Sequence, residues 1–193
     1  MVANVPEGSL LILDEAYGQF MPASDIPKID ANDTRVIRFR TFSKAYGMAG
    51  ARVGYGIGHP ELITAFNKVR NHFGMSRVSQ AGALAALKDT DYLMNTQKRV
   101  RDANARIAKI AQDNGLSVLP SATNFVAIDC GKDGSFAKAV LDALVSDGVF
   151  VRMPFVAPQN RCIRVSSGTS EDLDFFAEAL PKALNRATAS TQA

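Results

Sequence analysis

The sequence has few of the residues that hold disulfide-rich or metal-dependent domains together. It contains no tryptophan, two cysteines and two histidines among 193 residues. Cys130 and Cys162 form no C-x-x-C pair, and His59 and His72 lie far from both in the sequence. This spacing indicates neither a metal site nor a disulfide framework. A reducing, cytoplasmic compartment is therefore expected.

The chain also lacks long hydrophobic runs and an excess of charge of one sign. Lys and Arg total 22 against 19 Asp and Glu, and the scattered basic residues argue against a nucleic-acid surface. The N-terminal segment has no basic region, and its apolar run at residues 10–13 is too short for a signal peptide or a membrane span. With 47% hydrophobic and 21% charged residues, the composition predicts a soluble globular protein with no membrane partner.

Three common catalytic motifs are missing as well. The apolar run ends in an acidic pair, as in nucleotide triphosphatases, but Asp133 follows the only Gly-Lys pair, so the phosphate loop G-x-x-x-x-G-K-[ST] is absent. Alternate glycines at 54, 56 and 58 do not complete the dinucleotide motif G-x-G-x-x-G, because position 59 is His59. The G-x-S-x-G elbow of serine hydrolases is not present either.

Hydropathy periodicity predicts an α/β chain. Its first part is expected to contain strands at 10–13, 34–42 and 51–57, a helix that begins at Pro60, and one long helix or two helices over 79–114. The first strand is expected to be buried on both faces of a parallel sheet. The second part is expected to contain strands at 116–119, 124–128, 149–153 and 162–166, and helices at 136–145 and 170–184. Ser170 is expected to cap the last helix.

These elements place a domain boundary near residue 100, inside the long helical stretch. Residues 1–100 would form an α/β part, and residues 101–186 a compact α+β part. Residues 187–193 are small and polar, and we expect them to form a frayed tail.

One group of residues in the first quarter of the chain is chemically distinctive: Asp14, Tyr17, Thr41, Ser43, Lys44 and Arg52. A lysine beside hydroxyls suits a Schiff base to an aldehyde cofactor whose phosphate is bound by those hydroxyls and a guanidinium group. A carboxylate such as Asp14 can keep a pyridine nitrogen protonated, and a phenol such as Tyr17 can hydrogen-bond the 3-oxygen of the ring. Taken singly, Lys44, Asp14 and Arg52 are better explained as a loop lysine, a helix cap and a surface ion pair.

Taken together, the segments LLILDEAYGQF and RFRTFSKAYGMAGARVGYGIG resemble the fold-type I pyridoxal-phosphate aminotransferases, nearest the histidinol-phosphate aminotransferase branch. The resemblance continues through VRNHFGMSRVSQAGALAAL, LPSATNFVAI, GVFVR and RCIRVSSGTSEDLDFF. It implies the C-terminal part of a large domain, with a mostly parallel sheet and helices, followed by a small α+β domain. It also implies that the full-length protein is a homodimer, because the family's site lies at a dimer interface, whereas the oligomeric state of this shortened chain stays open.

The resemblance further implies roles for individual residues, with pyridoxal 5'-phosphate as the cofactor. Lys44 would be the covalent and proton-transferring residue, Asp14 the partner of the pyridine nitrogen and Tyr17 that of the 3-oxygen. Thr41, Ser43 and Arg52 fall on phosphate-binding positions. Arg164 resembles the arginine that takes the substrate carboxylate, Arg152 a second arginine near it, and Asn124 a motif position near the site.

The implied reaction moves an amino group between an amino acid or amino-phosphate and a 2-oxo acid. Histidinol phosphate and aromatic amino acids both remain candidates, because Asn71, His72, Phe73 and Gly74 depart from the pattern of the branch. Two alternatives stay open. One is a phosphothreonine decarboxylase of the same fold. The other is a non-catalytic fragment, because the family's N-terminal segments, which help to bind the cofactor, have no counterpart ahead of LLILDEAY.

Overall fold

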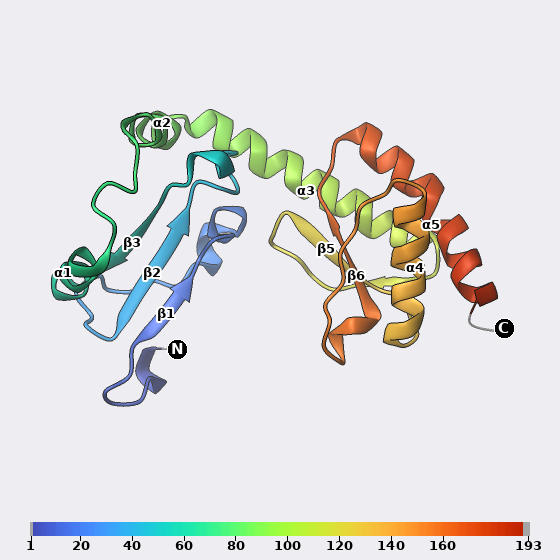
Figure 1. Ribbon diagram of the computed structural model, residues 1–193, viewed down its shortest axis with the longest axis horizontal. Helices are drawn as coiled ribbons and strands as arrows, with labels where there is room; N and C mark the ends of the chain where they lie inside the picture. Colours follow the sequence, from blue (N-terminus) through green and yellow to red (C-terminus); the bar gives the residue numbers. More distant parts are fainter. Residues whose placement is uncertain (1, 191–193) are drawn as a thin grey trace. The chain divides into compact units, whose positions relative to one another are not determined.

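The computed structural model describes residues 2–190 and divides the chain into two compact units, Met1–Gln97 and Lys98–Ala193 (Figure 1). Helix α3 (Thr90–Asp113) runs through the division. The boundary predicted near residue 100 lies within a few residues of it. Each unit is described by itself below.

The first unit contains a three-stranded sheet with the order β1-β2-β3 (Figure 1). Strand β1 (Leu11–Asp14) pairs in parallel with β2 (Val36–Thr41), and β2 pairs antiparallel with β3 (Gly54–Gly58). Four short 3-10 turns lie at Val2–Asn4, Gly18–Phe20, Ala23–Asp25 and Ala49–Ala51. The three predicted strands are therefore present, with shifted ends.

The expectation that the first strand is buried on both faces is wrong for this unit. Residues of β1 alternate between half-buried and exposed, and Ile12 is 60% exposed. Within residues 2–190, the exposed side of Ile12 is not covered by another element, and β1 is also an edge strand whose one partner in this range is β2. Burial of an apolar strand depends on its neighbours, which the apolar run itself does not specify.

Two helices follow the sheet in the first unit. Helix α1 (Pro60–Val69) begins at the predicted proline, and the His59 side chain accepts a hydrogen bond from the Glu61 amide. Phe66 of α1 packs edge-on against Phe39 of β2, with ring centres 5.7 Å apart. Helix α2 (Arg77–Lys88) ends at Asp89, whose carboxylate accepts a hydrogen bond from Tyr92 and so starts α3. The long helical stretch is therefore two helices, separated by a capping aspartate.

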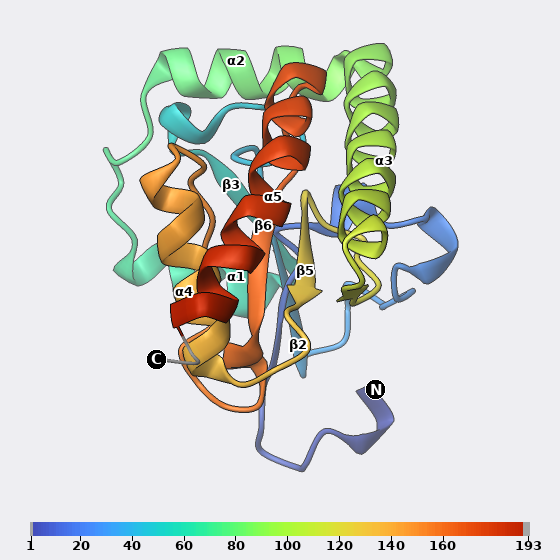
Figure 2. The ribbon, with the colours of Figure 1, turned by 90° about the vertical axis from the view of Figure 1, so that its right-hand side faces the viewer.

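The second unit consists of an antiparallel sheet with the order β4-β5-β6, packed with helices. Its strands are β4 (Ser117–Val118), β5 (Phe125–Asp129) and β6 (Cys162–Ser166). Helices α4 (Gly134–Ser146) and α5 (Ser170–Ser190) lie side by side (Figure 2), and a 3-10 turn, Gln159–Arg161, precedes β6. One continuous core joins α3, the sheet, α4 and α5 through the fully buried Ile107, Ile128, Leu144, Ile163 and Leu180.

Three expectations about the second unit need correction. The strand predicted at 149–153 is reduced to one bridge between Arg152 and Arg164, because Pro154 has no amide hydrogen with which to extend the pairing. The cap of α5 is Thr169 rather than Ser170, since Thr169 and Asp172 each accept a hydrogen bond from the other's amide. Residues 187–190 belong to α5 instead of a frayed tail, and residues 191–193 lie outside the described part of the chain.

Candidate active site

Asp14 and Tyr17 lie where the chain leaves β1. Asp14 is the last residue of the strand, and its exposed carboxylate accepts a hydrogen bond from the Ala16 amide at 2.9 Å. This bond turns the chain toward the half-buried Tyr17, directly before the turn Gly18–Phe20. Because β1 and β2 are parallel, the loops that follow them leave the same edge of the sheet.

Lys44 lies in the loop after β2 and reaches the Tyr17 ring. Its Nζ is 5.3 Å from the ring centre, within the range of a cation–π contact. The lysine side chain is exposed, whereas its neighbours Phe42 and Ala45 are 3% and 0% exposed. The buried neighbours anchor the loop, so the amine is presented from a fixed backbone. The structure therefore brings together the predicted covalent residue and the predicted phenol.

Thr41, Ser43 and Arg52 form a second cluster at the same loop. The Ser43 amide donates to Thr41 Oγ1 at 3.0 Å, and Arg52 Nη1 lies 3.5 Å from Ser43 Oγ and 2.8 Å from the Ala49 carbonyl oxygen. The Arg52 backbone has φ 52° and ψ 47°, the left-handed conformation that non-glycine residues rarely adopt. Hydroxyls beside a guanidinium group suit a phosphate, and strained backbone of this kind often marks a binding site.

An ion-pair network behind Asp14 was not singled out by the sequence. Arg38 donates to Glu15 Oε1 through Nε at 3.0 Å and Nη2 at 2.6 Å, and Arg40 Nε donates to Glu15 Oε2 at 2.9 Å. Burial raises the pKa of Glu15, but the hydrogen bonds and positive charges of the two arginines lower it by more. The net pKa of Glu15 is therefore below its ordinary value. The network ties the residue after Asp14 to β2. The alternation of arginines along 34–42 was its only sequence signal.

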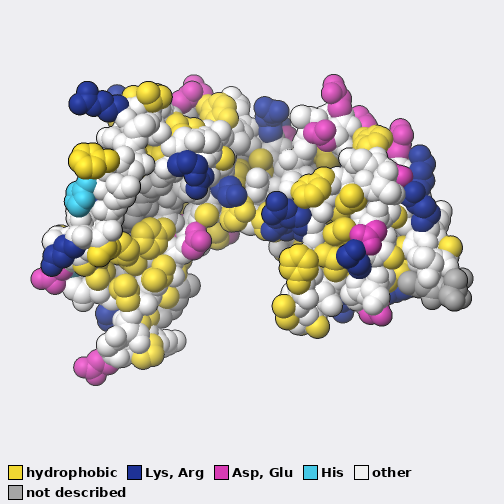
Figure 3. Space-filling model, in the orientation of Figure 1, with side chains coloured by type: hydrophobic (Ala, Val, Ile, Leu, Met, Phe, Trp, Pro, Cys, Tyr) yellow, Lys and Arg dark blue, Asp and Glu magenta, His cyan; other side chains and the backbone are white. Residues whose placement is uncertain are grey.

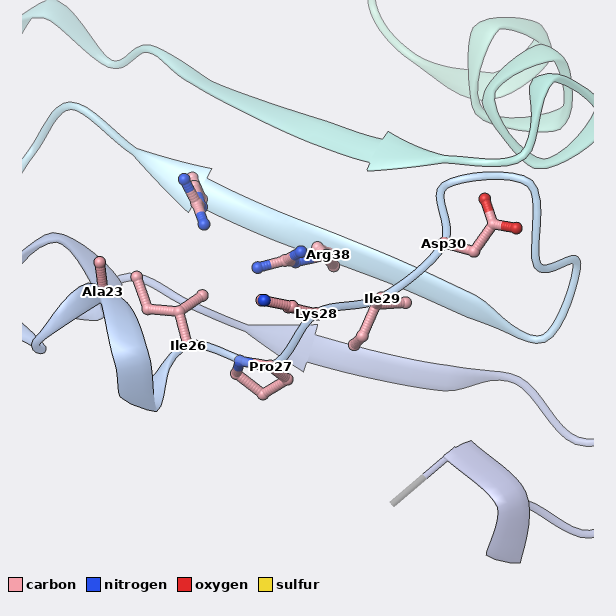
Figure 4. A pocket seen from close by; sticks show the side chains of 8 residues that line it. Ala23, Ile26, Pro27, Lys28, Ile29, Asp30 and Arg38 are labelled. Carbon is pink, nitrogen blue, oxygen red and sulfur yellow. The ribbon is translucent and has the colours of Figure 1, made fainter.

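A pocket of about 570 Å³ lies beside this network but away from the predicted site residues. Figure 4 shows Lys28 and Ile29 of the loop that precedes β2, with Arg38 of the strand alongside. None of the six candidate residues of the first unit lines it. Its arginines, Arg38 and Arg40, are already paired with Glu15. The pocket is therefore separate from the residues that the sequence analysis singled out.

Two arginines of the second unit are cross-strand neighbours. The backbones of Arg152 and Arg164 exchange hydrogen bonds at 3.1 and 2.6 Å. Arg164 Nε is buried without a hydrogen-bond partner among the described residues, and its Cζ lies 4.7 Å from the centre of the Phe125 ring. Arg152 is exposed, with its Cζ 5.7 Å from the centre of the Phe150 ring. Like charges on opposed residues are unfavourable, so this pair is suited to bind an anion.

Asn124 is half-buried in the loop that enters β5. Its carbonyl oxygen accepts a hydrogen bond from the Ser167 amide at 2.9 Å, where the chain leaves β6. Phe125 and Ser166 are the terminal pair of β5 and β6, and Asn124 comes one residue before Phe125. Asn124 therefore lies at the end of the strand pair that contains Arg164. The structure thus places all three predicted substrate-binding residues of the second unit on β6 or its neighbouring segments.

Other kinds of site find no support in residues 2–190. No group of His, Cys, Asp and Glu within this range could hold a metal ion. Across the same residues, no helix has the length and apolar character needed to span a bilayer. Figure 3 shows basic side chains interspersed with acidic and apolar ones on the visible face of the molecule.

The fold and the lysine-bearing loop lead to a definite protein class. A family model described as aminotransferase class I and II matches residues 1–180. The chain belongs to this family.

The relatives narrow the comparison to one branch. A histidinol-phosphate aminotransferase of Bacillus pumilus is 40% identical over 171 residues, which cover 87% of this chain and 46% of the relative. Histidinol-phosphate aminotransferase 2 of Pseudomonas fluorescens is 36% identical over 187 residues, 95% of this chain and 50% of the relative. The chain therefore spans about half the length of the curated relatives that it matches.

A solved structure supports the same comparison. The crystal structure of histidinol-phosphate aminotransferase from Sinorhizobium meliloti, in complex with pyridoxal-5'-phosphate, has a TM-score of 0.90 and 53% identity. The match covers 93% of this chain and 50% of that one. This similarity confirms the predicted α/β fold class and the family resemblance.

Proposed function

We propose that this protein is a pyridoxal-phosphate-dependent aminotransferase, which exchanges an amino group between an amino acid or amino-phosphate and a 2-oxo acid. The observation that carries the proposal is the 5.3 Å contact between Lys44 Nζ and the Tyr17 ring, at the sheet edge where Asp14 also lies. A nucleophilic amine, a phenol and a carboxylate on adjacent loops are the groups that this cofactor requires.

The residues present in the first unit fit the cofactor. Ser43 and Arg52 lie within 3.5 Å of each other and offer a hydroxyl and a guanidinium group to a phosphate, next to Thr41. Asp14 would face the pyridine nitrogen and Tyr17 the 3-oxygen. When bound, pyridoxal phosphate supplies an electron-withdrawing ring that stabilises the negative charge left as the α-proton of the substrate departs.

Lys44 would perform the proton transfer. Its exposed amine stands on a loop anchored by Phe42 and Ala45, so Nζ can move while the backbone stays in place. The Lys44 amine would accept the proton from the substrate α-carbon as a general base. The arginine pair of the second unit would hold the substrate, because Arg164 presents a buried Nε without a protein acceptor. Its ligand would be the α-carboxylate or phosphate of the substrate, with Arg152 and Asn124 beside it.

Histidinol phosphate is the substrate best supported, because the relatives described above are histidinol-phosphate aminotransferases. Aromatic amino acids are the second candidate, and each offers an anionic group to the arginine pair. We also propose that the full-length protein is a homodimer in the cytoplasm. The low cysteine content, with Cys130 and Cys162 buried and not joined in a disulfide, supports the proposed compartment.

Cofactor labelling tests the proposal. The 193-residue chain is mixed with pyridoxal phosphate, its absorbance is recorded, and borohydride reduction is followed by mass mapping of the modified peptide. We expect one label, on Lys44, which Lys44→Ala abolishes. Lys68→Ala is the matched control, because Lys68 is an exposed helix lysine outside the site and its loss should leave the label intact. Labels spread over many lysines would contradict the proposal for this chain.

A further inference from the structure

We propose that Asn104 is a positioning residue for the anion site around Arg164. Asn104 lies on α3, which runs alongside the sheet of the second unit (Figure 2). Its Nδ2 donates to the Thr123 carbonyl oxygen at 2.7 Å, and its Oδ1 accepts from Ser167 Oγ at 2.7 Å. One half-buried side chain thus joins the segment that enters β5 to the segment that leaves β6.

These two segments determine where the groups of the anion site lie. The last ladder pair of β5 and β6 is Phe125 with Ser166, so the sheet itself imposes no pairing beyond that point. There the backbone is held by the bond from Ser167 to Asn124 at 2.9 Å and by Asn104. The Phe125 ring, next to Asn124, packs 4.7 Å from Arg164 Cζ. Movement of either segment would therefore change the packing of the arginine.

The asparagine amide satisfies both partners, since it carries a donor and an acceptor. The Thr123 carbonyl needs a donor, whereas the Ser167 hydroxyl donates and needs an acceptor. Aspartate would place a carboxylate oxygen against the carbonyl, and alanine would leave both groups without this partner. Asn104 also reaches partners distant in the sequence, whereas Lys98 and Lys109 of the same helix pair with residues one turn away. The inference rests on the proposed function in one respect, namely that Arg164 binds a substrate anion.

Nuclear magnetic resonance on the full 193-residue chain tests the proposal without any cofactor. The Arg164 Nε–H group lies near the Phe125 ring, so its proton resonance carries a ring-current shift that Phe125→Leu removes. We expect Asn104→Ala to move this resonance toward its position in Phe125→Leu. Ser167→Ala deletes one of the two bonds without altering α3 and should give a smaller change in the same direction. Asn114→Ala is the matched control, because the Asn114 side chain donates to the Ile110 carbonyl oxygen one turn away and not to the segments around Arg164.

Titration with succinate, a dicarboxylate probe, supplies the second readout. We expect succinate to shift the Arg164 resonance in the unaltered chain and to bind about fivefold more weakly to Asn104→Ala, as the loss of about 1 kcal/mol of positioning implies. An Asn104→Ala chain with unchanged Arg164 resonance and unchanged succinate affinity would overturn the proposal. If succinate fails to bind the unaltered chain, the proposed substrate site is wrong, and the ligand-free resonance still decides the role of Asn104.

Discussion

The ammonium group of Lys44 lies 5.3 Å from the centre of the Tyr17 ring, and this contact joins the loops that follow two parallel strands. Tyr17→Phe keeps the ring but removes the phenol that would hydrogen-bond the cofactor. We expect it to weaken pyridoxal-phosphate binding about fivefold, the effect of one hydrogen bond of about 1 kcal/mol, while Lys44 remains the labelled residue. Absorbance titration gives the affinity, and peptide mapping gives the site. Unchanged affinity would exclude the phenol from cofactor binding.

Two substitutions of Arg52, to glycine and to alanine, distinguish the effect of its left-handed backbone on stability from the effect of its side chain on cofactor binding. Because its φ is 52°, glycine fits the backbone better than alanine does, so Arg52→Gly should be more stable than Arg52→Ala by about 1 kcal/mol. Both variants lack the guanidinium group and should bind cofactor equally weakly. Urea unfolding measures the first difference and absorbance titration the second. An alanine variant as stable as the glycine variant would show that the left-handed backbone carries no strain.

The ion-pair network of Glu15 predicts a specific pH dependence. The net pKa of Glu15 is lowered in the folded chain, so its carboxylate stabilises the fold above the ordinary value of 4.5, and this contribution is lost as the pH falls through the folded value. Glu15→Gln should reduce the free energy of unfolding by about 2 kcal/mol at neutral pH. The difference from the unaltered chain should shrink below pH 4.5.

Asp33→Asn provides the control for this experiment. Asp33 also has a lowered pKa, because Arg35 hydrogen-bonds it, but this pair lies on the surface. Exposed pairs contribute little, so its loss should change stability much less than the loss of Glu15. Urea unfolding across a pH series compares the two variants. A Glu15→Gln deficit that persists undiminished in acid would contradict the assigned role of the carboxylate.

Both cysteines should resist alkylation in the folded chain. Burial raises the pKa of Cys130 to about 12 and also raises that of Cys162. Since the thiolate is the reactive form, iodoacetamide at neutral pH should modify neither residue until the chain is unfolded. Mass spectrometry of native and urea-treated samples measures the labels. Rapid labelling of Cys130 under native conditions would show that the second unit opens around β5.

The sequence predicted best the elements whose limits are set locally. The strand at 162–166 has the predicted bounds, and α1 begins at Pro60, whose ring favours a first helical turn. The prediction of a strand at 149–153 was wrong. A strand needs continuous pairing with a neighbour, and Pro154 prevents the pairing from extending beyond the bridge between Arg152 and Arg164. The exposed face of β1 likewise depends on which elements cover it, a property of the tertiary structure.

In the candidate site, too, residues in local motifs were predicted, whereas residues that depend on distant partners were not. Lys44, Asp14 and Arg52 were predicted because a motif places them at characteristic spacing, although their roles stay predictions. Glu15 and Asn104 carried no such signal, since each acts through partners distant in the sequence. An asparagine side chain on a helix can equally point to solvent, so its type alone does not separate a positioning role from solvent exposure.

The continuous core of the second unit has a consequence for any thermal experiment on this chain. The buried core cluster of the first unit is much smaller and consists of Phe42, Val53 and Ala83 with their partly buried neighbours. Resistance to unfolding scales with buried apolar surface, so the two units differ in their intrinsic melting behaviour. We therefore expect the two units to unfold as separate cooperative blocks, so that a single transition temperature would average them. The effects of substitutions at Lys44 and at Arg164 on unfolding would therefore be distinguished only by probes placed separately in the first and the second unit.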